Sequence, residues 1–373
     1  MSSARSVEAI VSEIESQADR LDRLADEADS LGRAPVELVD AMREIRVPMI
    51  KAPVEVGGDH LHLADQFRFF SALSYRNATA AWTGFNHAGA CGMAGARLGD
   101  RGIAELFADG ACPFIAAVSA PSGTFTAVDG GYRLTGRWKY ASGVPHSEFI
   151  LLTALAGGEA PRPRILIVRA EQVTITGEWD VMALKGTGSI DVVADDVFVP
   201  EHLTIDPVRT VHRGGPMFNL SYQGYVAPEN LGFTLGVCQR FIDEMIVHAK
   251  AKSRGFDGRL VDRGAFKYEL GKAQLQLDAA RGYGLSEFAA VDTLLRRGET
   301  LNSAGNERLG GVLAYATELA VGAVTHLFHF AGAGALFNSS VLSRLFRDAV
   351  GSHQHLMASN VAYDRRGERL VSS

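Results

Sequence analysis

The stretch VSAPSGTFTAVDGGYRLTGRWKYASGVPHSEFILLTA, residues Val118–Ala154, decides how the rest of the chain is interpreted. Its segments TFTAV, YRLTGRW and FILLTA are short and are either alternating or rich in β-branched and aromatic residues, which is typical of strands. Asp129, Gly130 and Gly131 separate the first two segments. Because glycine accepts positive φ at no steric cost, DGGY predicts a tight hairpin turn. This stretch therefore predicts a β hairpin followed by another strand.

The β pattern extends on both sides of this stretch, over residues 112–213. RILIVRA and SIDVVADDVFVP add short runs punctuated by Gly, Pro and Asp, at the spacing of an antiparallel barrel or sandwich. Residues 1–111 repeat apolar residues at helical spacing, and residues 214–373 contain long helical patterns typical of a four-helix bundle. We therefore expect an α+β chain of three domains: N-terminal helices, a central antiparallel β barrel and a C-terminal helical bundle.

The composition is that of an ordinary globular protein, since 47% of the 373 residues are apolar and 21% are charged. The net charge of −6 and the lack of a basic cluster with interleaved aromatic residues argue against nucleic acid as a partner. Three cysteines without CxxC spacing suit a reducing cytoplasm, where we expect the protein. We expect no membrane span, because no run of about 18 apolar residues occurs. We expect no metal site either.

Three blocks of the sequence resemble the acyl-CoA dehydrogenase superfamily. The opening stretch resembles the superfamily's middle domain, in which a GGY-L-G-W-S/TG hairpin lies against the flavin ring. DVMALKGTGSIDVVADDVFVPEHL (Asp180–Leu203) resembles the next block, and RLFRDAVGSHQH (Arg344–His355) resembles the late R-RDA helix start. The blocks stand in the superfamily's order. The resemblance covers nearly the whole chain and implies a homotetramer with flavin between the β domain and the bundle.

The superfamily divides by chemistry, and the residues after Asp348 favour one side. Its dehydrogenases remove an α-proton with a glutamate, commonly eight residues after this aspartate, and Leu356 occupies that place. Its two-component flavin-dependent monooxygenases (group D) have a histidine seven residues after the aspartate, where this chain has His355. Without a carboxylate to take the α-proton, a thioester cannot begin to reduce flavin. The resemblance therefore implies an oxygenase.

Such an enzyme receives reduced FMN or FAD from a separate flavin reductase. With O₂ it acts through a C4a-hydroperoxyflavin, and it hydroxylates an aromatic substrate or oxidises nitrogen or sulfur of a small molecule.

The resemblance assigns three catalytic residues. His355 would act as general acid/base for the peroxide or the substrate, and His87 would orient a phenolate, amine or thioether and help to deprotonate it. Ser142 would place its hydroxyl on flavin N5. On one helix His353 would lie two steps of about 100° from His355. We therefore expect His353 to face elsewhere.

The other predicted site residues are assigned to flavin and substrate. Trp138 and Tyr140 would form an aromatic wall beside the flavin ring, and Arg254 would reach the flavin phosphate of a neighbouring subunit. Further flavin contacts are expected from Ser142, Gly143, Thr187, Gly188, Ser189, Phe330, Gly332 and Gly334. An apolar substrate pocket is indicated by Met217, Phe218 and Tyr222.

Two alternatives stay open. An acyl-CoA dehydrogenase or oxidase would use Glu229 as base, near the start of the C-terminal domain, although an ungapped count puts Val226 at the matching point. A non-catalytic member would keep the fold as a binding module. The presence of His355, His87 and Ser142 argues against this second alternative.

Overall fold

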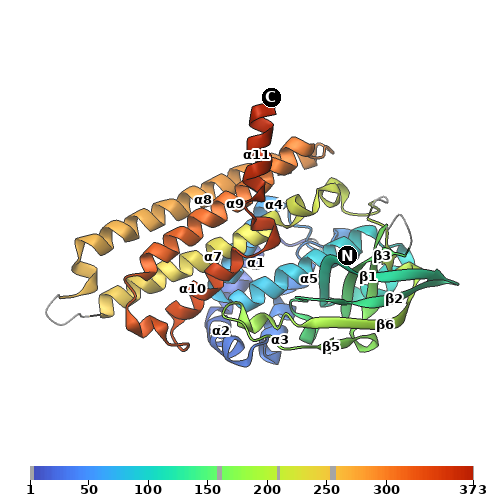
Figure 1. The fold of residues 1–373 in the computed structure, drawn as a ribbon, viewed down its shortest axis with the longest axis horizontal. Coiled ribbons are helices and arrows are strands. Elements are labelled where there is room, and N and C mark those ends of the chain that lie inside the picture. Colours follow the sequence, from blue (N-terminus) through green and yellow to red (C-terminus); the bar gives the residue numbers. More distant parts are fainter. Residues whose placement is uncertain (1–3, 158–161, 208–210, 253–257, 373) are drawn as a thin grey trace.

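The computed structural model describes residues 4–157, 162–207, 211–252 and 258–372, and it has helices at both ends of the chain with a sheet between them (Figure 1). The N-terminal helices are α1 (Val7–Ser16), α2 (Ala18–Leu31), α3 (Val36–Ile45), α4 (Leu63–Arg76), α5 (Ala78–Arg97) and α6 (Asp100–Leu106). Helix α5 matters most for function. Its side-chain cap is Asn77, which accepts a hydrogen bond from the Ala80 amide. Its many Ala and Gly residues let neighbouring elements approach it closely.

A seven-stranded sheet forms the middle of the chain. Its strands are β1 (Ile115–Val128), β2 (Gly131–Trp138), β3 (Phe149–Ala156), β4 (Pro163–Arg169), β5 (Thr174–Thr176), β6 (Asp191–Pro200) and β7 (Thr204–Ile205). The predicted hairpin is confirmed, since β1 and β2 are antiparallel and Val128 pairs with Gly131. Gly130 adopts a φ of +74°, as the tight turn requires.

The sheet is mixed, which corrects the expected antiparallel barrel. Its order is β5-β6-β2-β1-β3-β4-β7, and β3 runs parallel to β1. The physical reason is the connection after β2: it carries the chain past β1, so β3 pairs on the far side of β1 and points the same way. Among the described strands, β5 and β7 stand at opposite edges and do not pair.

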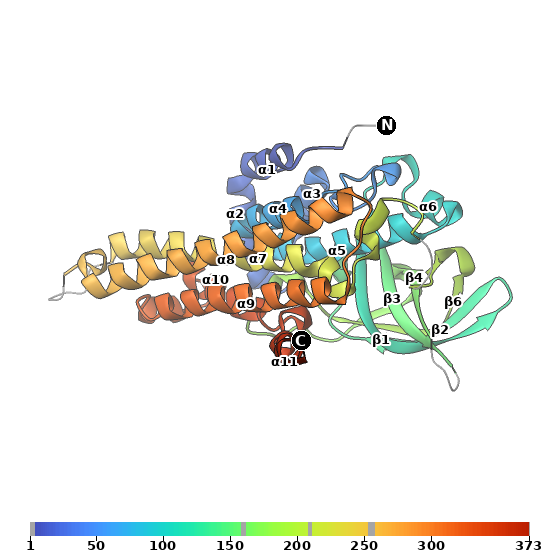
Figure 2. The ribbon, with the colours of Figure 1, turned by 90° about the horizontal axis from the view of Figure 1, so that it is seen from above.

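The C-terminal helices form an elongated bundle, in which α7 to α10 lie side by side (Figures 1 and 2). They are α7 (Tyr222–Ala251), α8 (Gly264–Arg296), α9 (Ser303–Phe328) and α10 (Val341–Ser352), followed by α11 (Val361–Ser372). By length and hydropathy alone α9 is able to cross a membrane. It packs against α7, α8, α10 and α11, so we assign it to the bundle.

Helix α5 belongs to two hydrophobic cores. Phe85 and Ala88 pack in the helical core, whereas Cys91 and Ala94 pack in the core of the sheet. The helix therefore lies where sheet and bundle meet, and its side chains reach both. All strands lie within the predicted middle domain of residues 112–213, while the three-domain division itself stays a prediction.

Candidate active site

Trp82 on α5 connects four separate parts of the chain. Its indole N–H donates a hydrogen bond to Ser142 Oγ, which lies 3.3 Å away in the connection after β2. Its ring lies 4.8 Å from Phe85, 4.8 Å from Phe233 on α7 and 5.7 Å from His355 between ring centroids, each pair edge to face. Ser142 and His355, which the sequence predicted as catalytic, thus contact one indole. No motif or spacing in the sequence indicated a role for Trp82.

His355 does not lie on the helix that the sequence predicted. Helix α10 ends at Ser352, whose hydroxyl accepts a hydrogen bond from Thr234 of α7, and His353 is the C-cap. His355 precedes the short 3₁₀ helix η12 (Leu356–Ala358) as its N-cap. The angle expected between the two histidines was therefore wrong, because the helix ends before both.

The imidazole of His355 is neutral at neutral pH. Burial lowers its pKa to about 4. Its Nδ1 accepts a hydrogen bond from the Met357 amide at 3.3 Å, so in the neutral ring the proton sits on Nε2. His355 therefore offers a hydrogen-bond donor at Nε2, which narrows its predicted acid/base role to donation toward an oxygen atom.

Three hydroxyls meet beside Trp82. Ser142 Oγ lies 2.8 Å from Ser189 Oγ, and Ser189 Oγ lies 2.7 Å from Thr187 Oγ1. Thr187 donates in turn to the Leu184 carbonyl at 2.8 Å. The structure thus brings together Ser142, Thr187 and Ser189, as the sequence analysis expected. The 3₁₀ helix η6 (Lys185–Thr187) supplies Thr187, and the segment after it supplies Ser189.

The backbone around these hydroxyls is bent into left-handed conformations. Gly143 has a φ of +77° and Gly188 a φ of +52°. The Gly143 amide donates to the Thr187 carbonyl at 3.0 Å, which joins the two loops. The glycines let the loops pack against other side chains, since a Cβ on Gly143 would lie 2.5 Å from His87 Nε2. The Ser142 hydroxyl at the junction of the loops is the polar group that would meet the edge of a planar ring such as flavin.

The segment Arg347–Ala349, here called the RDA block, binds the loop that precedes Thr187. Asp348 Oδ1 accepts the Leu184 amide at 2.7 Å, and Arg347 donates to the Met182 carbonyl at 2.7 Å. Arg347 also pairs with Asp29 of α2 at 2.9 Å. Burial raises the pKa of Asp348 to about 6. The block therefore fixes the position of the loop that carries Thr187.

Glu229 of α7, the alternative base, is enclosed in an ion pair. Its Oε2 lies 2.8 Å from Lys51 Nζ, and the two side chains are 1% and 0% exposed. Lys51 also donates to the Tyr225 carbonyl at 2.7 Å and lies 3.5 Å from the centre of the Tyr225 ring. Burial raises the pKa of Glu229 to about 7, and the ammonium opposes this shift. A carboxylate held in this way is not free to take a substrate proton.

Comparisons with known proteins agree with this geometry. A family model described as "Acyl-CoA dehydrogenase, C-terminal domain" matches residues 231–360. The solved structure of XiaF from a Streptomyces species, in complex with FADH₂ and glycerol, shares the fold: its TM-score is 0.89 at 24% identity, over 98% of this chain and 96% of XiaF. Residues 231–360 thus resemble the C-terminal domain of acyl-CoA dehydrogenases, and the whole chain shares the fold of XiaF.

Two curated relatives are hydroxylases. A "Pigment production hydroxylase" from a Rhodococcus species is 27% identical over 332 residues, which span 85% of this chain and 84% of the relative. A "FADH(2)-dependent resorcinol hydroxylase, oxygenase component" from a Rhizobium species is 26% identical over 92% of this chain and 90% of the relative. The resemblance stated from the sequence is thereby confirmed.

His87 does not fit the role that the superfamily resemblance gave it. It is fully buried, and its Nδ1 lies 3.0 Å from the Ile115 carbonyl, to which it donates. Its Nε2 accepts a hydrogen bond from the Nε2–H of His146, and the two nitrogens are 3.0 Å apart. Both nitrogens are used inside the protein, so neither reaches a substrate. The sequence analysis did not include His146, because its only signal is a place four residues after Ser142.

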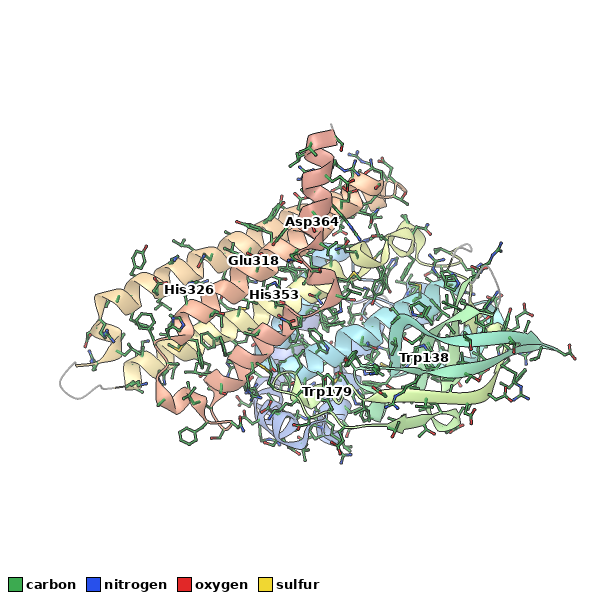
Figure 3. The ribbon with its side chains drawn as sticks, viewed as in Figure 1. Trp138, Trp179, Glu318, His326, His353 and Asp364 are labelled. Carbon is green, nitrogen blue, oxygen red and sulfur yellow. The ribbon has the colours of Figure 1, made fainter. Side chains whose placement is uncertain are left out.

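The predicted aromatic wall is only half present. Trp138 is fully buried within the sheet and donates to the Thr153 carbonyl at 2.7 Å, so it does not face a ligand. Tyr140 is 68% exposed, with a φ of +65°, and its ring lies 6.3 Å from that of Trp179. Figure 3 shows Trp138 among the strands and Trp179 where the sheet meets the helices. Trp179, which the sequence analysis missed, replaces Trp138 as the partner of Tyr140.

The glycine-rich turn with Phe330, Gly332 and Gly334 is not brought to Ser142. The Ala331 carbonyl in this turn accepts hydrogen bonds from His248 and Lys252, near the C-terminal end of α7. Phe233, which contacts Trp82, lies fifteen residues earlier on α7 than His248. At 1.5 Å per residue this is a rise of about 22 Å. The predicted contact of Arg254 with flavin phosphate lies outside the described residues.

The three predicted substrate residues are placed differently. Met217 and Phe218 are buried in the helical core, where Met217 Sδ accepts a hydrogen bond from Gln66. Tyr222, at the start of α7, is partly exposed. Of the three, Tyr222 alone presents a ring to an incoming molecule.

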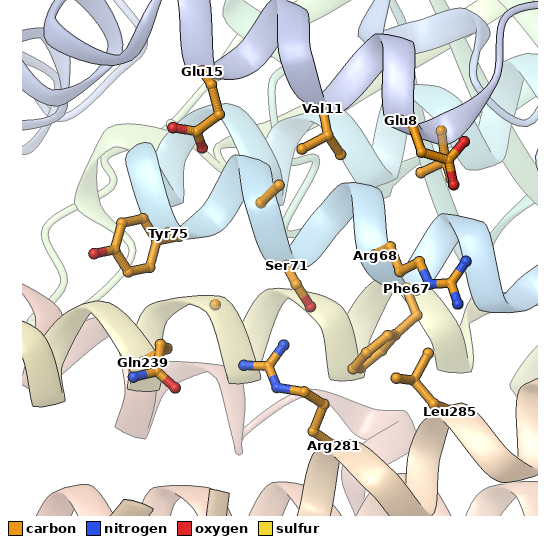
Figure 4. Close-up of a pocket in the computed structure, with 13 residues that line it drawn as sticks. Glu8, Val11, Glu15, Phe67, Arg68, Ser71, Tyr75, Gln239, Arg281 and Leu285 are labelled. Atoms are coloured by element: carbon orange, nitrogen blue, oxygen red, sulfur yellow. The ribbon is translucent and has the colours of Figure 1, made fainter. Parts of the chain in front are cut away.

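A cavity of about 440 Å³ lies elsewhere, between α1, α4, α7 and α8 (Figure 4). None of the predicted site residues lines it. Among the residues that the structure describes, no group of three or more His, Cys, Asp or Glu side chains is arranged to hold a metal ion.

Proposed function

We propose that the chain is the oxygenase component of a two-component flavin-dependent monooxygenase. A separate reductase would deliver reduced FMN or FAD, as the name of the oxygenase relative from Rhizobium supports. Bound reduced flavin supplies the two electrons with which O₂ is activated. The chain itself would position the flavin edge at Ser142, exclude water and orient the substrate.

One observation carries this proposal: His355 and Ser142 contact the same indole, that of Trp82, and both residues considered as a dehydrogenase base are missing or engaged elsewhere. The place of the dehydrogenase base holds Leu356, which is 76% exposed. Glu229 is held by Lys51. The site therefore offers the Nε2–H of His355 as a hydrogen-bond donor for an oxygen atom, and it lacks the base that acyl-CoA oxidation needs.

The surroundings of His355 favour an aromatic substrate. The rings of Trp82 and Phe85 pack edge to face against it, Phe233 packs against Trp82 in turn, and such rings favour another ring. Hydroxylation of an aromatic ring is therefore the first proposed reaction. Oxidation of a nitrogen or sulfur atom attached to such a ring fits the same enclosure.

Within one chain the Phe330–Gly334 turn lies far from Ser142, and this separation supports our proposal that several copies assemble into a homotetramer. If the turn contacts flavin, as we propose, it does so on the flavin of another copy of the chain. Within the described part of the chain Cys91, Cys112 and Cys238 are free thiols, which suits our proposal of a cytoplasmic location.

The test is to mix the protein with photoreduced FMN or FAD and oxygenated buffer, and to follow absorbance on the millisecond-to-second scale. We expect a long-lived species that precedes oxidised flavin and is missing without protein. Reoxidation as fast as for free flavin, together with bleaching of bound oxidised flavin by acyl-CoA, would contradict the proposal in favour of a dehydrogenase.

A further inference from the structure

The hydroxyl network beside Trp82 has a fixed direction. A carbonyl oxygen can only accept a hydrogen bond, so the single hydroxyl proton of Thr187 is donated to the Leu184 carbonyl. Ser189 must then donate to Thr187, because Thr187 has no proton left for their 2.7 Å contact. Ser142 must donate to Ser189 across 2.8 Å for the same reason. The order of donation is Ser142 to Ser189 to Thr187 to Leu184.

The first oxygen of this series is left with acceptor capacity only. A hydroxyl oxygen donates one hydrogen bond and accepts two. Ser142 Oγ donates to Ser189 and accepts from the Trp82 indole, which leaves one lone pair and no proton. A ligand atom placed against Ser142 is therefore favoured if it carries a proton and disfavoured if it carries a lone pair.

The far end of the network is held firmly, which prevents its reversal. The Leu184 carbonyl accepts from the Thr187 hydroxyl, the Thr187 amide at 3.1 Å and the Trp179 indole at 3.1 Å. Thr187 and Ser189 are 1% and 3% exposed, so no water replaces a link from the protein surface. The Leu184 amide is bound to Asp348. The network thus links the RDA block to Ser142.

We propose that Ser189 and Thr187 are positioning residues that make the site select the reduced state of flavin. Flavin N5 carries a proton in the reduced state and only a lone pair in the oxidised state. With N5 at Ser142, reduced flavin donates to the waiting lone pair, whereas oxidised flavin faces it lone pair to lone pair. This inference rests on the proposed function, with the flavin edge at Ser142 turned so that N5 meets that hydroxyl. It would let an oxygenase take reduced flavin from its reductase and release the oxidised product.

The decisive measurement is the ratio of the dissociation constants for oxidised and reduced flavin, measured by anaerobic and aerobic ultrafiltration of the full chain with FMN and with FAD. Ser189→Ala removes the acceptor of the Ser142 proton, so that Ser142 becomes able to donate to oxidised N5. We expect the ratio to fall about tenfold, chiefly because oxidised flavin binds more tightly. By the thermodynamic cycle this lowers the two-electron potential of bound flavin by about 30 mV.

Two further variants separate direction from structure. Thr187→Val frees the Ser189 proton, which then turns to Ser142, so it should lower the ratio in the same sense as Ser189→Ala. Thr187→Ser keeps every link and should keep the ratio of the unaltered protein. The two lowering variants test different links, so the failure of either to fold leaves the other decisive.

The outcomes distinguish the inference from the proposed function. If Ser189→Ala and Thr187→Val weaken both flavin states by the same factor, or leave the ratio unchanged, the network only supports structure and the inference is wrong. If the unaltered protein binds neither FMN nor FAD in either state, the proposed function fails, and the inference fails with it.

Discussion

The proton on His355 illustrates how a single backbone contact sets the role of a side chain. The Met357 amide, two residues ahead, binds Nδ1 and leaves the proton on Nε2. Burial against Trp82 and Phe85 keeps the ring neutral by lowering its pKa to about 4. A neutral ring with its proton on Nε2 stabilises a nearby oxygen by donation, without changing its charge.

We predict that His355→Ala lowers the rate of product formation about 10²-fold, the usual loss for one donor at a reacting oxygen. Hydrogen peroxide release should rise, while the affinity for reduced flavin stays unchanged. The matched control is His353→Ala, because His353 is the C-cap of α10, two residues before His355; its effect should stay within about twofold. Normal turnover by His355→Ala would remove the role given to this residue.

The Lys51–Glu229 pair joins helix α7, which faces α5, to the segment between α3 and α4. Pro228 lies inside α7 and interrupts the helical hydrogen bonds of its turn. Lys51 then donates to the Tyr225 carbonyl as well as to Glu229. On the facing helix, Gly89 and Gly92 leave room: a Cβ on Gly92 would lie 2.3 Å from the Tyr225 hydroxyl. These glycines of α5 let α7 approach closely, while the ion pair joins α7 to the segment before α4.

Removing one partner of this pair should destabilise the fold strongly. For Glu229→Gln we expect a loss of about 3–5 kcal/mol in the free energy of unfolding, because an unpaired ammonium stays buried. The double variant Lys51→Met/Glu229→Leu should lose less than Glu229→Gln alone, since no charge remains. Urea unfolding followed by circular dichroism measures both. A double variant that loses as much as Glu229→Gln, or more, would show that the unpaired charge is not the cause of the loss.

At the scale of the whole molecule, buried titratable groups make the global stability depend on pH. Burial lowers the pKa values of His146 and His355 to about 4 and that of His87 well below its ordinary value. The folded chain then binds fewer protons at these sites than the unfolded chain, so each site costs stability as pH falls from 6.5 toward 4. Asp348 and Glu229, whose pKa values are raised, act with the opposite sign.

A comparison with His355→Gln isolates one of these contributions. The glutamine side chain does not titrate, so the variant lacks the loss of stability that His355 causes in the unaltered chain at low pH. Between pH 7.5 and pH 5 we expect the stability of the unaltered chain to decline relative to the variant by about 1–2 kcal/mol. Urea unfolding at both pH values measures this difference. A constant difference would mean that His355 titrates alike in the folded and unfolded chains.

Short-range patterns determined much of this protein. The Asp129–Gly130 turn and the alternation around it predicted the β1–β2 hairpin, and helical periodicity predicted the bundle. Both depend on residues a few positions apart, so they can be read from the sequence alone. The oxygenase branch was indicated by resemblance, from the three family blocks and from Leu356 in place of a glutamate.

Only the tertiary structure decided which atoms of the site are free. Trp82 meets Ser142 from 60 positions away, and Asp348 meets Leu184 from 164 positions away. The sequence predicted a catalytic role for His87, but His146 binds its second nitrogen. It also predicted that Trp138 contacts flavin, but Trp138 is enclosed within the sheet. A side chain's chemistry depends on its unsatisfied donors and acceptors, and distant parts of the chain satisfy them. The sequence therefore named Ser142 and His355, and the fold decided which protons they carry.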